Sequence, residues 1–143
     1  MKFAEIWDFA GYTEEISSME DGFTESYDGL TIAIAPNGAD PDHDKISAEG
    51  VYWRGGASSG ESARYISYVP DADGVLIARG RTHRSDGRWG ISDSLDVSSM
   101  SVSNSSTLTS VSTVSMECSA GNAYYIINKN RPATVSMIAY VSE

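Results

Sequence analysis

Basic side chains gather in one part of a chain that is acidic overall. Arg79 and Arg81 stand two positions apart in the apolar stretch Gly74–Thr82, so in a β-strand they would share a face. Guanidinium groups hold carboxylates through two parallel hydrogen bonds in one plane. Several along a shallow face would suit a polymer with a carboxylate on every sugar, although they could instead pair with the chain's own acids or cover its surface. The candidate ligand-binding cations are Arg54, Arg79, Arg81, Arg84, Arg88, Lys129 and Arg131.

Two tryptophans adjoin these arginines. Trp53 precedes Arg54, and Trp89 follows Arg88, each with glycines close by. Flat aromatic faces can stack against the C–H surface of a sugar ring, so both tryptophans are candidate ligand platforms. The alternative is that they belong to the core, where most aromatic side chains of a β-sandwich lie.

A short acidic loop has the spacing of a calcium site. Asp40, Asp42 and Asp44 alternate with other residues, and hard oxygen ligands at such spacing can converge on one ion. The full EF-hand pattern is missing, because the sixth position has no glycine and the twelfth has no glutamate. The alternative is a solvated acidic loop. We expect a calcium ion here, if bound, to be structural, and we expect the function to need no cofactor.

Residues for catalysis are not arranged in a recognisable pattern. His43 and His83 fall in unrelated loops, and no serine stands in a Gly-x-Ser-x-Gly elbow. Acidic pairs are abundant, but 20 acids in one chain produce such pairs without any catalytic role. The sequence therefore predicts a protein that is not an enzyme.

The charge is distributed unevenly along the 143 residues. The net charge is −10, and residues 1–50 hold 12 acids and 2 bases, whereas residues 51–143 hold 8 of each. This balance argues against nucleic acid as a partner, since neutralising phosphates needs a basic face. No apolar run approaches the roughly 20 residues of a transmembrane helix, so no membrane contact is expected.

Short alternating segments separated by turn residues predict an all-β fold. We expect a single antiparallel β-sandwich over residues 1–143, jelly-roll-like and with almost no helix. A turn at 85–87 should return residues 88–92 alongside the preceding strand. The expected strands are 2–9, 30–35, 45–48, 51–54, 63–69, 74–82, 88–92, 113–119, 122–128 and 133–142, with a short one within 94–112. The expected core contains Trp7, Phe9, Leu30, Ile32, Ile34, Ile66, Leu76, Ile126 and Ile138.

The order of these motifs resembles a family of carbohydrate-binding modules. The motifs are Trp7-x-Phe9, Asp28-Gly-Leu-Thr-Ile32, the aromatic-basic-Gly-Gly stretch from Tyr52 to Gly56, Arg64-Tyr-Ile-Ser-Tyr68, Gly74-Val-Leu-Ile-Ala78, Ala123-Tyr-Tyr-Ile-Ile-Asn128 and the closing Val135-Ser-Met-Ile-Ala-Tyr-Val141. Together they are similar to the β-sandwich modules appended to pectate lyases and other plant-cell-wall enzymes, including the pectin-binding modules of rumen cellulosomes. Those pectin-binding members use mainly lysines, where this chain has mostly arginines.

This resemblance implies a non-catalytic module that recognises an acidic plant polysaccharide, with pectin or homogalacturonan as the expected ligand. It also implies a secreted, extracellular protein that is one part of a larger modular enzyme. Because no leader peptide opens the chain, we expect the chain to be an excised module. We expect a monomer. Two other classes stay open: a structural or adhesion sandwich of a phage or surface fibre that binds no sugar, and a small hydrolase or lyase.

Overall fold

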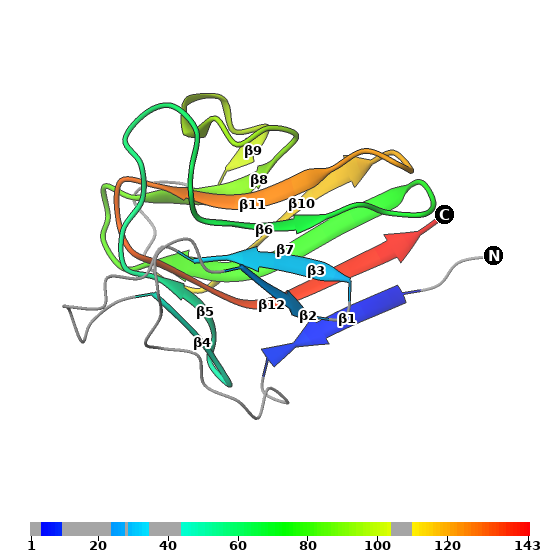
Figure 1. The fold of residues 1–143 in the computed structure, drawn as a ribbon, viewed down its shortest axis with the longest axis horizontal. Coiled ribbons are helices and arrows are strands. Elements are labelled where there is room, and N and C mark those ends of the chain that lie inside the picture. Colours follow the sequence, from blue (N-terminus) through cyan, green and yellow to red (C-terminus); the bar gives the residue numbers. More distant parts are fainter. Residues whose placement is uncertain (1–3, 10–23, 28, 35–43, 104–109) are drawn as a thin grey trace.

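Twelve β-strands and one short 3-10 helix make up the part of the chain that the structure, a computed structural model, describes: residues 4–9, 24–27, 29–34, 44–103 and 110–143 (Figure 1). The strands form two six-stranded antiparallel sheets that pack as a sandwich. No α-helix occurs within these described ranges. The predicted all-β antiparallel sandwich is therefore confirmed.

The first sheet is called the β12 sheet here, because β12 pairs with three of its strands. Its order is β10-β7-β12-β5-β4, and β1 also pairs with β12, beside the part of that strand that β5 does not reach. The bounds are β1 Ala4–Asp8, β4 Lys45–Ser47, β5 Gly50–Trp53, β7 Gly74–Thr82, β10 Ser112–Cys118 and β12 Ala133–Ser142.

The second sheet, called the β11 sheet, has the order β2-β3-β6-β11-β8-β9. Its strands are β2 Thr24–Tyr27, β3 Leu30–Ala33, β6 Tyr65–Tyr68, β8 Arg88–Ser92, β9 Val102–Ser103 and β11 Tyr124–Lys129. The 3-10 helix η2, Val97–Ser99, precedes β9, so the predicted loop with a short strand is present here. Residues 104–109 lie outside the described part.

One predicted strand pairing is wrong. The turn at 85–87 was expected to lay β8 against β7, but β8 pairs with β11 and β9 in the other sheet. The turn thus carries the chain from one layer of the sandwich to the other. β5 and β6 are divided between the two sheets in the same way.

The space between the two sheets holds one hydrophobic core. All nine residues predicted for it are buried. Along β7 the burial alternates, so that Leu76 and Ala78 face the core while Ile77 and Arg79 face outward. The strand therefore presents every second residue to the outer face of the β12 sheet, where the candidate site lies.

Candidate functional site

The outer face of the β12 sheet carries a groove that contains Arg79 and Arg81. It consists of two adjoining hollows of about 320 Å³ each, which share Glu49, Val111 and Ser136. The first hollow is lined by Glu49, Gly80, Arg81, His83, Val111, Thr134 and Ser136, and the second by Asp8, Ala48, Glu49, Arg79, Val111, Ser136 and Met137. We call these two hollows together the β7–β12 groove.

Strand pairing explains the shape of this groove. Its floor is β7 and β12, in which Arg81 faces Thr134 and Arg79 faces Met137 across the ladder. One wall is the turn between β4 and β5, at Ala48 and Glu49. The other wall is Val111, immediately before β10, which is 49% exposed. The groove thus runs along β7 and β12, between the β4–β5 turn on one side and Val111 on the other.

A β-bulge in the floor depends on two glycines. The register of β12 against β7 shifts between Val135 and Met137, so Ser136 is the extra residue. Its hydroxyl donates to the carbonyl oxygen of Arg79 at 3.2 Å. A Cβ on Gly80 would overlap the carbonyl oxygen of Thr134, and one on Gly50, at φ +119°, would overlap that of Val135. The neighbouring strands therefore approach the bulge closely only because both residues lack a side chain.

The charges in the groove are mixed. Arg79 is exposed and forms no ion pair with any residue whose position the structure describes. The carboxylates of Asp8 and Glu49 line the same groove. A ligand carboxylate would therefore meet guanidinium groups on the floor and acidic side chains at one wall.

His83 stands at the end of the groove where β7 ends. Its Nε2 is 2.7 Å from the hydroxyl of Thr134, and its ring meets that of Tyr52 edge-on, with centroids 5.4 Å apart. Burial lowers the pKa of the His83 imidazole, and the positive charge of Arg81 lowers it further. The ring is therefore held mostly neutral near pH 7, next to a permanent cation.

The other predicted cations do not join this groove. Arg131 binds Asp86 through its Nε at 2.9 Å and a terminal nitrogen at 2.7 Å, both to one carboxylate oxygen. This ion pair ties the turn after β11 to the turn before β8. Arg88 and Lys129 face each other across the β8–β11 ladder, in the other sheet, and Arg84 is exposed in the turn between the sheets. With Arg54, which follows β5, the structure divides the expected cluster among four places.

Asp44 is buried and contacts the backbone of Arg54 rather than lining an open site, while the Arg54 side chain is exposed and does not line the groove. One oxygen of Asp44 accepts the backbone N–H of Arg54 at 2.8 Å, and the other accepts Nε of Arg64 at 2.8 Å. Asp44 is fully buried. Of the predicted calcium ligands, Asp40 and Asp42 lie outside the described residues. Within the described ranges, no group of three acidic, histidine or cysteine side chains could hold a metal ion.

The assignment of the two tryptophans as ligand platforms is wrong. Trp53 and Trp89 are each 0% exposed and belong to the core between the sheets. The indole N–H of Trp53 donates to the carbonyl oxygen of Ala33 at 3.3 Å, which joins the two layers. A ring without exposed surface offers no face to a sugar. Tyr52 is instead the aromatic side chain that contacts the groove residue His83.

The groove residues that come from other strands could not be predicted from the sequence. The alternation of β7 was enough to place Arg79 and Arg81 on one face, but Asp8, Glu49 and Thr134 reach it only through the order of strands in the sheet. No local pattern signals that order. The sequence did contain a signal for Tyr52. Adjacent strand residues face opposite sides, so placing Trp53 in the core would have placed Tyr52 on the outer face.

No protein-family model and no curated protein matches the chain. Among solved structures, a Ruminococcus flavefaciens cellulosome protein, from a study of glycan recognition, shares 14% identity over 98% of this chain and 94% of that chain (TM-score 0.44). The C-terminal CBM6 of a Zobellia galactanivorans laminarinase shares 11% identity over 99% of this chain and 100% of that chain (TM-score 0.43). An adhesin domain of the Porphyromonas gingivalis Lys-gingipain shares 12% identity over 100% of this chain and 99% of that chain (TM-score 0.45). Similarities of this size do not identify a ligand for this chain.

No helix in the described residues is long and apolar enough to cross a membrane.

Proposed function

We propose that this protein is a non-catalytic carbohydrate-binding module that takes an acidic plant polysaccharide, chiefly weakly esterified homogalacturonan, in the β7–β12 groove. The observation that carries this proposal is that Arg79 and Arg81 lie in the floor of a groove on the outer face of the sheet. An elongated groove accepts a chain rather than a compact ligand. Two guanidinium groups on one strand would each meet a carboxylate of that chain.

The hydroxyl and imidazole groups beside the arginines can form hydrogen bonds with the hydroxyl groups of a sugar. Thr134 and Ser136 line the groove between the two arginines, and both carry hydroxyl groups. An exposed ion pair contributes only about 0.2–1 kcal/mol, so the two arginines must act together with such hydrogen bonds. The expected affinity is therefore modest, and it should decline at high ionic strength as the ion pairs are screened.

The module binds without turnover in this proposal, and it needs no metal. It acts as a monomer within a larger modular, extracellular enzyme, where it holds the enzyme on its polymer. Asp8 and Glu49 repel carboxylates at one wall, so a bound polymer would turn its carboxylates toward Arg79 and Arg81 on the floor.

Affinity electrophoresis on gels that contain pectin, xylan or glucan tests this function. We expect the free acid of pectin to retard the protein more than its methyl ester, because esterification removes the charge. Arg79→Ala and Arg81→Ala should each weaken the retardation while the melting temperature stays unchanged. Arg84→Ala is the matched control, because it removes the same charge from an exposed turn outside the groove.

Two results would contradict the proposal: equal binding of the ester and the free acid, or stronger binding of neutral glucan than of either. Release of reducing ends from the polymer would contradict the absence of turnover.

An adhesion or structural module is the second candidate, and one surface favours it. Ile6 is 65% exposed on β1, and across the ladders it faces Ala139 and then Ile77, which are both half-buried. These three side chains form an apolar strip on the outer face of the β12 sheet. A protein that no polysaccharide gel retards, but that loses self-association or protein binding on Ile6→Lys, would favour this candidate.

A further inference from the structure

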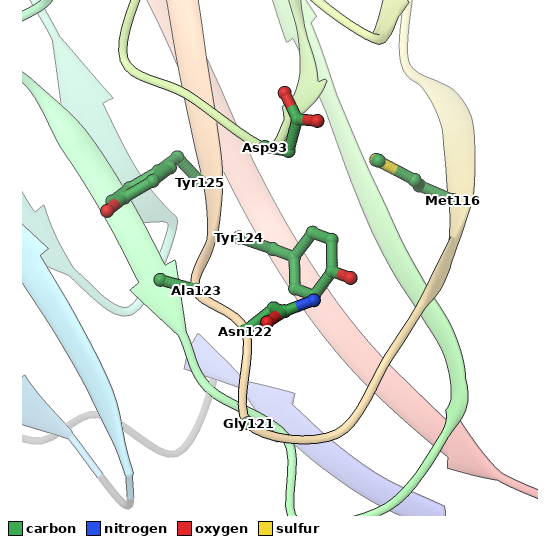
Figure 2. A pocket seen from close by; sticks show the side chains of 7 residues that line it. All are labelled: Asp93, Met116, Gly121, Asn122, Ala123, Tyr124 and Tyr125. Atoms are coloured by element: carbon green, nitrogen blue, oxygen red, sulfur yellow. The ribbon is translucent and has the colours of Figure 1, made fainter.

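A separate hollow, outside the β7–β12 groove, lies at the opposite end of β10. The groove reaches Val111, just before β10 begins, whereas this hollow includes Met116 and the turn that follows the strand. Seven strand residues lie between the two turns, a length of about 20 Å. The hollow has a volume of about 460 Å³, within the usual range for small-molecule sites. It is lined by Asp93, Met116, Gly121, Asn122, Ala123, Tyr124 and Tyr125 (Figure 2).

Two polar side chains stand at the rim of this hollow. One oxygen of Asp93 accepts the hydroxyl of Ser101 at 3.4 Å, and the backbone N–H of Asp93 donates to the same hydroxyl at 3.4 Å. No residue in the described ranges bonds the other Asp93 oxygen. The amide of Asn122 is exposed in the turn before β11, and Figure 2 shows it below the ring of Tyr124. The rim thus offers a carboxylate acceptor and an amide that both donates and accepts.

The inner wall of the hollow is apolar and fixed. Met116 and Tyr124 turn toward the space from β10 and β11, while Tyr125 leaves β11 on the other side (Figure 2). The hydroxyl of Tyr124 accepts the backbone N–H of Ser119 at 2.7 Å, which holds the ring in place. Because Tyr124 is only 6% exposed, it offers a small area of ring surface and Met116 supplies the other apolar contact.

We propose that this hollow binds one neutral sugar residue, independently of the groove. A sugar ring presents an apolar C–H surface, which suits Met116 and Tyr124, and a rim of hydroxyl groups, which suits Asp93 and Asn122. None of the lining residues is basic, and Asp93 repels carboxylates, so a uronic acid is excluded. The chain would therefore hold a neutral sugar at one end of β10 and an acidic polymer at the other.

Nuclear magnetic resonance titration of the ¹⁵N-labelled protein tests this proposal. The probes are the methyl glycosides of glucose, galactose, mannose, xylose and arabinose. The signals are the side-chain amide of Asn122 and the backbone amide of Ala123, and the second of these also reports on the Asn122→Ala variant. At least one glycoside should shift these signals with a dissociation constant on the order of 1 mM, because a single sugar makes few contacts. Asp93→Ala and Asn122→Ala should each weaken that binding about tenfold.

Matched controls separate this site from the groove. Glu61→Ala removes an exposed acid elsewhere and should leave the titration unchanged, as should Arg79→Ala and Arg81→Ala. The proposal is overturned if no glycoside shifts the Asn122 amide. It is also overturned if Asp93→Ala and Asn122→Ala bind the sugar as the unaltered protein does, or if the groove variants lose it. If the unaltered protein bound a glycoside in this hollow but did not bind pectin, the groove assignment would be contradicted and the neutral-sugar site would stand.

Discussion

At the scale of single residues, two carboxylates that pair with arginine have very different surroundings. Asp44 is fully buried and receives one hydrogen bond on each oxygen, whereas the Asp86–Arg131 pair is largely exposed. Removing one partner of a buried pair leaves the other without compensation, but an exposed ion pair contributes little. We predict that Asp44→Asn lowers the free energy of unfolding by about 2 kcal/mol, because Arg64 and the N–H of Arg54 lose their charged acceptor.

Urea denaturation measures this difference. Asp86→Asn is the matched control, and it should leave the midpoint almost unchanged. Equal midpoints for the two variants would show that Asp44 does not hold the segments of Arg54 and Arg64 together.

The imidazole of His83 gives the groove a pH dependence. Its folded-state pKa lies below the unfolded value of about 6.5 because of burial and the nearby Arg81. Its contribution to stability is therefore present above pH 6.5, and it is lost as the pH falls through the folded-state pKa, because the unfolded chain binds the proton first. Once protonated, however, His83 adds a positive charge beside Arg81.

We predict that affinity for polygalacturonate rises by up to about fivefold between pH 7.5 and pH 5.5, the factor that an exposed ion pair of about 1 kcal/mol gives. The polymer carboxylates stay largely ionised above a pH of about 4. Calorimetric titration at both pH values measures the rise, and His83→Gln should show the same affinity at each. A rise of the same size in His83→Gln would place the titrating group elsewhere.

Residue-level patterns predicted which side chains share a face, but not which faces are open. The alternation in β7 placed Arg79 and Arg81 together, and the structure confirms it. The positions of Trp53 and Trp89 beside arginines suggested ligand contact, yet each strand turns the arginine outward and the tryptophan inward. Adjacent residues in a strand face opposite sides, so a tryptophan next to an outward-facing arginine should have been predicted to face the core.

At the scale of elements, the bulge in β12 determines the shape of the groove floor. Gly80 lets β7 approach the carbonyl oxygen of Thr134, and an added methyl group would force the two backbones apart. We predict that Gly80→Ala costs about 1–3 kcal/mol of unfolding free energy. It should also weaken pectin binding, because Arg79 and Arg81 flank this glycine.

Gly55→Ala is the control for that substitution, since a Cβ there meets no atom within 4 Å and it should be tolerated. Urea denaturation and affinity electrophoresis give the two readouts. A Gly80→Ala variant as stable as the Gly55→Ala variant would mean that β7 and β12 can separate at no cost.

Strand positions could be predicted from the sequence, but strand partners could not. The bounds of β7, β8 and β12 agree with the alternation of their residues. The turn at 85–87 has the same Gly/Asp/Ser composition whether it closes a hairpin or crosses between sheets. The crossing brings together segments that are far apart in the sequence, such as those of Asp86 and Arg131, which are 45 positions apart, and no local pattern signals such a contact.

At the scale of the whole molecule, the net charge opposes the acidic ligand that we propose for the groove. The chain carries −10 overall, and the excess of acids lies in residues 1–50, while the remaining residues are balanced. A polyanion approaching from a distance meets the field of the whole protein, and only at contact does it meet Arg79 and Arg81. Salt weakens both effects, but it weakens the interactions between distant charges first.

We therefore predict that affinity for polygalacturonate passes through a maximum as salt increases. From about 0.01 to 0.1 M the Debye length falls from about 30 to 10 Å, which removes the long-range repulsion. Toward 1 M it falls to about 3 Å, and the ion pairs in the groove weaken in turn. Calorimetric titration across this range should show the maximum, whereas methyl-esterified pectin should respond little. A steady fall from the lowest salt would mean that the acidic residues of the first third of the chain do not act on the groove, and that the local cations alone govern binding.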